Sequence, residues 1–106
     1  MYYNSMEEWV KMNDKKPSRV ELNIYGRVQG VWFRYETMEV ANSLGIKGFV
    51  ENMPDGSVHV IAEGEREKLE KLIDFCRKGP PLARVDKVDI SWRESTGEFI
   101  SFSIRR

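Results

Sequence analysis

The sequence is poor in the residues that build metal clusters and disulfides. It holds one cysteine, Cys76, and one histidine, His59, among 106 residues. A single cysteine cannot form an internal disulfide, so an oxidising compartment is not required and the cytoplasm is the default location. Cysteine-based and histidine-rich metal sites are excluded, because neither residue type is numerous enough to supply the ligands.

The sequence also lacks a long apolar run and an excess of one charge. No apolar stretch approaches the ~20 residues that a membrane-spanning helix needs, and the first 16 residues contain acidic side chains without an apolar signal-peptide core. Lysine plus arginine and aspartate plus glutamate each number 17, so the formal net charge is zero. We therefore expect no membrane or nucleic-acid partner, while a local anion site stays possible. The length and composition suit one soluble globular domain.

From Arg19 onward, apolar and polar residues alternate in segments that predict strands. The first strand follows Arg19, the second spans about residues 47–52, and the third runs from Val58 to Gly64. A fourth strand precedes the turn at residues 95–97. The apolar residues expected in a last, short strand are Ile100, Phe102 and Ile104.

Two segments between the strands carry apolar residues at helical spacing. One helix is expected at about residues 34–44 and another at about residues 65–78, and Gly45 and Gly79 follow them as helix-ending glycines. The resulting order, β-α-β-β-α-β with a further short C-terminal strand, predicts an α+β fold. The economical packing is a ferredoxin-like sandwich, in which both helices lie on one face of an antiparallel sheet.

Residues 1–18 precede this pattern and end in a polar, proline-containing segment. We therefore divide the chain into an N-terminal extension, residues 1–18, and one domain, residues 19–106. Two alternatives stay open for the extension. It either docks on the domain as a short helix through Trp9 and Val10, or forms a disordered tail, which we favour.

A glycine-containing segment connects the first expected strand to the first expected helix. A loop in this position directs successive backbone N–H groups into one concavity at the positive end of the helix dipole, a geometry that binds tetrahedral anions. Gly26 and Gly30 permit unusual backbone angles, and Arg34 can offer a bidentate fork to phosphate oxygens. It is not a Walker loop, because no Gly-Lys-Ser/Thr follows. From spacing alone, a phosphate loop and an ordinary turn with a surface arginine are equally supported.

A second polar feature is Asn52, which ends the second expected strand just before an Asp-Gly turn. One interpretation is a turn-favouring asparagine, which is common at this place. The other is a neutral carboxamide that orients a water nucleophile. The residues alone favour the first interpretation.

Residues 25–34, Tyr-Gly-Arg-Val-Gln-Gly-Val-Trp-Phe-Arg, closely resemble the first signature of the acylphosphatase family. Gly48 to Asn52, followed by Gly56, Val58 and Gly64, resembles the second signature at the expected spacing. The resemblance spans about residues 19–106. It implies the ferredoxin-like fold and hydrolysis of the carboxyl–phosphate bond of acyl phosphates to a carboxylate and inorganic phosphate, without metal or cofactor.

The resemblance also implies roles for individual residues. Arg34 is expected to bind the substrate phosphate together with loop amides, and Asn52 to orient the attacking water. Glu51 departs from the family pattern, and by strand alternation we expect it to face away from Asn52. The implied phosphate-binding residues are Gln29, Gly30, Val31, Trp32, Phe33 and Arg34.

The expected partner is a small-molecule acyl phosphate, and inorganic phosphate or sulfate is expected to be able to occupy the same site. We expect a monomer. Three rivals stay open. The first is a binding module without catalysis, of the kind found in larger proteins that handle carbamoyl phosphate. The second is an RNA-binding domain of the same fold, and the third is a regulatory small-molecule sensor. The short chain favours a free-standing hydrolase over the binding module, and the balanced charge disfavours the RNA-binding domain.

Four other residues are assigned structural places. His59 is expected on the face of its strand opposite to Val58 and Val60, with no catalytic role. Cys76 is expected to be a small buried hydrophobe on the second helix. The aromatic residues expected in the core are Trp92 and Phe102.

Overall fold

The computed structural model describes residues 16–106. The predicted extension falls almost wholly on residues 1–15, outside the described part, so its docked and disordered alternatives stay predictions. Strands and helices follow one another in the order that the periodicity predicts, and the first strand begins two residues before Arg19. The elements are β1 (Pro17–Arg27), α2 (Phe33–Ser43), β2 (Lys47–Asn52), β3 (Val58–Glu65), α3 (Arg66–Lys78), β4 (Arg84–Glu94) and β5 (Phe102–Arg105).

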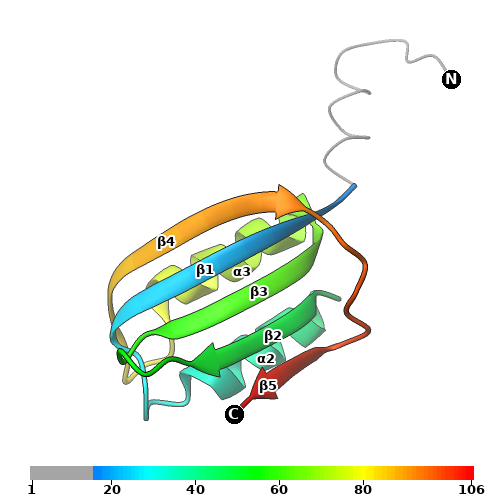
Figure 1. Ribbon diagram of the computed structural model, residues 1–106. Coiled ribbons are helices and arrows are strands. Elements are labelled where there is room, and N and C mark those ends of the chain that lie inside the picture. The colour runs from blue at the N-terminus through cyan, green and yellow to red at the C-terminus, as the bar shows by residue number, and fades with distance from the viewer. Residues whose placement is uncertain (1–15) are drawn as a thin grey trace, which may run out of the picture.

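The five strands form one sheet in the order β4-β1-β3-β2-β5, and both helices lie on the same face of it (Figure 1). The first four strands of this order pair antiparallel, as predicted. β5 pairs parallel to β2, so the complete sheet is mixed. The ferredoxin-like α+β fold is therefore confirmed, with one parallel edge that local patterning could not reveal.

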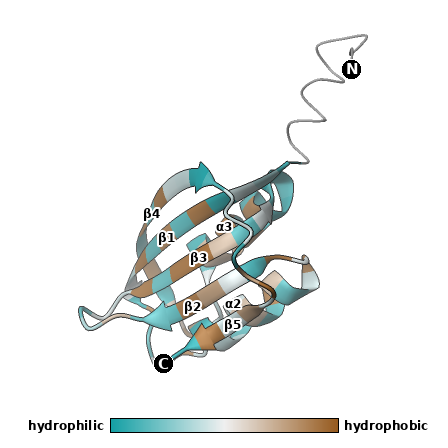
Figure 2. Ribbon diagram, turned by 45° about the vertical axis from the view of Figure 1, so that its right-hand side comes forward, coloured by the Kyte–Doolittle hydropathy of each residue, from teal (hydrophilic) through white to brown (hydrophobic). Residues whose placement is uncertain are grey.

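The core lies between the sheet and the helices, because one side chain in two on each inner strand points towards them. Pairing aligns Leu22 of β1 with Val60 of β3, and Val60 in turn with Val50 of β2, and all three are fully buried. Figure 2 shows the resulting alternation of hydrophobic and hydrophilic bands along the strands. No helix in the described part is long and apolar enough to span a bilayer.

The connection from β4 to β5 differs from the sequence prediction. Ile100 was expected in the last strand, but the strand begins at Phe102 and Ile100 is 92% exposed in the preceding loop. The reason is topological, because the chain must pass from the β4 edge of the sheet to the opposite edge before it can pair with β2 (Figure 1). The period-2 spacing therefore predicted a strand that begins too early, because Ile100 lies in the loop that crosses the end of the sheet.

Glu63, near the end of β3, holds this crossing loop in place. Its carboxylate accepts hydrogen bonds from the backbone N–H groups of Thr96 and Gly97, each at 2.9 Å, and from the hydroxyls of Ser95 and Thr96, also at 2.9 Å. Arg19 adds an ion pair at 3.0 Å. Burial alone would raise the pKa of Glu63, but these hydrogen bonds outweigh it and lower the pKa to about 2.

We expect the anchoring of this loop to depend on pH. Because folding lowers the pKa of Glu63, its contribution is present above about pH 4.5 and is lost as the pH falls towards about 2. Glu63→Gln should therefore lower the free energy of unfolding by about 2–3 kcal/mol near neutral pH. Urea unfolding should show that the difference from wild type shrinks at about pH 3, because the carboxyl of Glu63 is then largely protonated in the unfolded chain but not in the folded one. Glu94→Gln, at an exposed position of β4, is the matched control and should change little at either pH.

Candidate active site

The loop between β1 and α2 has the backbone conformation that its glycines suggested. Gly26 and Gly30 both have positive φ angles, of 129° and 76°. At Gly26 the register of the β1–β4 pairing shifts, and a side chain there would collide with the carbonyl oxygen of Arg84. A glycine is therefore required where β1 ends and the chain turns towards the helix.

The start of α2 leaves its backbone donors without side-chain caps. The residue that precedes the first helical turn is Trp32, in the left-handed region with φ 69°, and no side chain caps the helix there. The first N–H groups of a helix have no partners within the helix, and the helix dipole adds partial positive charge. The beginning of α2 can therefore donate hydrogen bonds to an anion bound in front of it.

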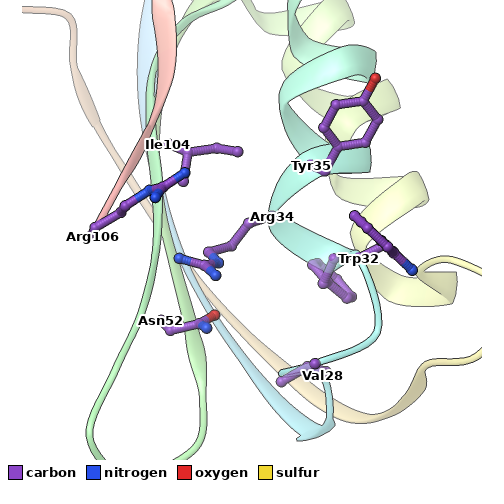
Figure 3. Close-up of a pocket in the computed structure, with 9 residues that line it drawn as sticks. Val28, Trp32, Arg34, Tyr35, Asn52, Ile104 and Arg106 are labelled. Carbon is purple, nitrogen blue, oxygen red and sulfur yellow. The ribbon is translucent and has the colours of Figure 1, made fainter.

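A cavity of about 430 Å³ lies in front of this helix end, between α2 and the sheet. Figure 3 shows the Arg34 guanidinium reaching from α2 towards the Asn52 side chain on β2. The two residues that the sequence singled out thus share one cavity, although 17 residues separate them in the chain. The cavity is lined by Val28, Gly30, Trp32, Phe33, Arg34, Tyr35, Asn52, Ile104 and Arg106.

Asn52 faces the helices, and its neighbour Glu51 faces away. Pairing with Val58 places Asn52 on the helix side of the sheet, and its Oδ1 atom is buried without a hydrogen-bond partner in the described part. A buried acceptor of this kind is normally satisfied, so a water molecule or substrate group is its natural complement. The expected orientation of Glu51 is confirmed, because its carboxylate lies 2.9 Å from His59 Nδ1.

Not every residue of the implied phosphate loop lines the cavity. The Val31 side chain is buried in the core, and the Gln29 side chain turns towards the β2–β3 turn. Gln29 Nε2 donates hydrogen bonds to the carbonyl oxygens of Met53 at 2.8 Å and Ser57 at 2.9 Å. Gln29 thereby ties the loop to the turn that follows Asn52. Backbone donation by Gln29 and Val31 to a phosphate stays a prediction.

The charge of the cavity is positive. Two arginines line it, Arg34 and Arg106, and neither has an ion-pair partner among residues 16–106. Within the part of the chain that the structure describes, no carboxylate, thiol or imidazole side chain belongs to the lining. The described residues also contain no group of three or more His, Cys, Asp or Glu side chains suited to a metal ion. The arrangement is therefore suited to binding an anion.

Arg106 is a cavity residue that the sequence analysis missed. β5 pairs parallel to β2, so Ile104 lies beside Val50 and the chain continues towards the cavity that contains Asn52. This placement depends on the crossing of the chain to the far edge of the sheet, for which the sequence carries no local signal.

The residues assigned structural places lie as predicted. His59 is on the open face of the sheet, where Nε2 lies 2.7 Å from Glu21 and Nδ1 lies 2.9 Å from Glu51. Cys76 is fully buried, and burial raises the pKa of its thiol to about 12. Phe102 is buried, while Trp92 is half-buried against the core beneath the guanidinium of Arg66.

Comparison with known proteins identifies relatives along nearly the whole chain. Residues 5–104 match the family model for acylphosphatase. The acylphosphatase of Methylococcus capsulatus is 47% identical over 88 residues, which cover 83% of this chain and 96% of that relative. The crystal structure of acylphosphatase from Bacillus subtilis is similar with a TM-score of 0.81 at 30% identity, covering 84% of this chain and 99% of that one. Full-length HypF, in a phosphate- and nucleotide-bound form, is similar with a TM-score of 0.79 at 28% identity, covering 86% of this chain but 12% of HypF.

Proposed function

Because this chain belongs to the acylphosphatase family, we propose that Arg34 and Asn52 carry out its reaction in the cavity between α2 and the sheet. The protein is an acylphosphatase, a hydrolase of acid anhydrides that cleaves the carboxyl–phosphate bond of acyl phosphates. The products are a carboxylate and inorganic phosphate. The observation that carries the proposal for the site is that a guanidinium lies in one cavity with a carboxamide oxygen that has no hydrogen-bond partner among residues 16–106.

The phosphate group binds in front of the start of α2. Backbone N–H groups of the loop and of the first helical turn donate to its oxygens, and Arg34 adds a charge-assisted bidentate contact. These donors are held in place by the fold before substrate arrives, so they need little reorganisation as charge develops on the phosphoryl oxygens. Inorganic phosphate or sulfate fits the same cradle as a competitive ligand.

Asn52 positions the water that attacks phosphorus. Its buried Oδ1 accepts a hydrogen bond from the water. This bond orients the water so that a lone pair of the water oxygen points at the phosphorus atom. The new O–P bond forms as the bond from phosphorus to the acyl oxygen breaks, and the carboxylate leaves with the bonding electron pair. The proton of the water passes to a phosphoryl oxygen, because the described residues that line the cavity offer no imidazole, thiol or carboxylate side chain as a base.

A carboxylate is a good leaving group, so this reaction needs positioning and charge stabilisation more than a strong acid or a metal. The cavity lining supplies cationic and neutral donors but none of the side chains that hold catalytic metals. This supports metal-independent turnover. The single, buried cysteine agrees with a cytoplasmic location, and we propose a monomer that acts without nucleic acid or membrane.

Release of inorganic phosphate from benzoyl phosphate in the presence of EDTA tests this function. We expect wild type to turn over at the same rate with and without the chelator. Activity that appears only after addition of a divalent metal would contradict the metal-independent mechanism. Tight phosphate binding without any turnover would instead support a binding module.

A further inference from the structure

Two exposed aromatic side chains stand at the edge of the cavity. Trp32 is 70% exposed and Tyr35 is 49% exposed, and both line the cavity. Among residues 16–106, four large hydrophobic side chains are exposed, and these are two of them. Their ring centroids lie 6.4 Å apart in an edge-to-face arrangement, which makes one continuous apolar rim. Exposed apolar surface gathered at a binding cavity is typical of a ligand contact.

Trp32 has a backbone conformation that is unusual for a tryptophan. Its φ angle of 69° lies in the left-handed region, where a bulky side chain is strained and glycine is not. A tryptophan there keeps a large ring in solvent at the cavity edge on a strained backbone, and no residue packs over most of its surface.

The direction of the reaction assigns a ligand to this rim. In an in-line displacement the leaving group departs on the side of phosphorus opposite to the attacking water. Figure 3 shows Asn52 and Arg106 on the sheet side of the cavity, and Trp32 and Tyr35 on the helix side, with Arg34 reaching between them. A water held by Asn52 therefore directs the acyl group away from the sheet and towards the aromatic rim.

We propose that Trp32 and Tyr35 form the subsite for the acyl group, and that they favour acyl phosphates with a flat aromatic acyl group over those with a short aliphatic one. This inference rests on the proposed function, because it takes the direction of departure from the place of the water at Asn52. An aromatic acyl group would stack on or against the rim and cover apolar surface that acetyl is too small to reach.

The test compares kcat/KM for benzoyl phosphate and acetyl phosphate in wild type, Trp32→Gly and Tyr35→Ala. Glycine suits the positive φ of position 32, so the first variant removes the ring without straining the loop. We expect each variant to lower the benzoyl-to-acetyl ratio about fivefold to tenfold. Tyr35→Ala should do so with acetyl phosphate turnover and inhibition by inorganic phosphate unchanged. Leu82→Ala removes another exposed apolar side chain, 68% exposed, and is the matched control with an unchanged ratio.

A binding measurement separates the subsite from the chemistry. Phosphonate analogues of the two substrates, with a CH₂ group in place of the bridging oxygen, are titrated by calorimetry against the same variants. The preference of wild type for the benzoyl analogue should fall by the same factor in Trp32→Gly. Because these analogues are not hydrolysed, this result decides the subsite even if wild type turns over neither substrate, which would count against the proposed function instead.

Three outcomes would overturn the subsite. An unchanged ratio in both rim variants would mean that the rings do not touch the acyl group. An equal loss of kcat/KM for both substrates in Trp32→Gly would mean that Trp32 only shapes the phosphate-binding loop. A fall in the ratio in Arg106→Gln as large as that in Trp32→Gly would place the acyl group on the sheet side of the cavity.

Discussion

Arg34→Ala should lower kcat/KM for benzoyl phosphate by about 10²–10³, which is the usual loss when one preorganised charge-stabilising donor is removed. Arg34 reaches from α2 into the cavity (Figure 3), and among residues 16–106 it is the one cationic side chain that lines the cavity from the helix side. Its contact with the phosphoryl oxygens exists in the bound substrate and strengthens as charge develops. The variant should therefore also lose affinity for inorganic phosphate, measured as a higher inhibition constant.

The stability of the same variant shows whether Arg34 is a functional or a structural residue. Arg34 lies in the first turn of α2, where a positive side chain opposes the helix dipole, and it has no ion-pair partner among the described residues. Removing it should leave the melting temperature unchanged or slightly raised while activity is lost. Arg27→Ala removes an exposed arginine on the other side of the same loop, and should leave both activity and stability near wild type. A large loss of stability in Arg34→Ala would contradict this assignment.

Asn52→Ala should lower kcat by about 10²–10³ while inhibition by inorganic phosphate stays unchanged. The reason is that its carboxamide holds the water and not the phosphate, so it acts in the transition state without strengthening ground-state binding. Steady-state kinetics with benzoyl phosphate, together with phosphate inhibition, separate the two effects. A variant that raises only KM would show that Asn52 binds substrate instead of positioning the water.

The packing around Asn52 makes a clean comparison possible. Its Oδ1 atom has no hydrogen-bond partner among the described residues, so truncation to alanine breaks no bond through that atom and should cost little stability. Asn42→Ala, at an exposed position of α2, is the matched control and should leave kcat unchanged. Equal losses of activity in the two variants would argue for a general effect on the fold.

Much of the fold could be predicted because its determinants are local. Period-2 alternation located the strands, and helical spacing with Gly45 and Gly79 located both helices and their ends. The same alternation placed Glu51 and Asn52 on opposite faces of β2 before any coordinate was known. The glycine-containing loop before α2 was recognisable because positive φ angles are available mainly to glycine.

The candidate site was only partly predictable, because a cavity is made by residues distant in sequence. Gln29 bonds to carbonyl groups 24 and 28 residues further along the chain, and nothing near Gln29 in the sequence indicates those partners. The clamp of Glu63 on the loop after β4 is of the same kind. The hydrogen-bond partners of Gln29 and Glu63 depend on how the strands pair, and strand pairing is a property of the assembled sheet.

What the sequence determined by itself was therefore the order of elements, the side of each strand that is buried, and the place of the glycine-containing loop that we propose binds the phosphate. These follow from hydrophobic period and backbone sterics, which act over a few residues. Tertiary structure alone decided that β5 pairs parallel to β2, that Arg106 and Ile104 join the cavity, and that Trp32 and Tyr35 form a rim opposite Asn52. These contacts form only when the sheet and both helices pack together. The packing depends on the balance between hydrophobic burial and conformational entropy over the whole chain, which no short segment determines.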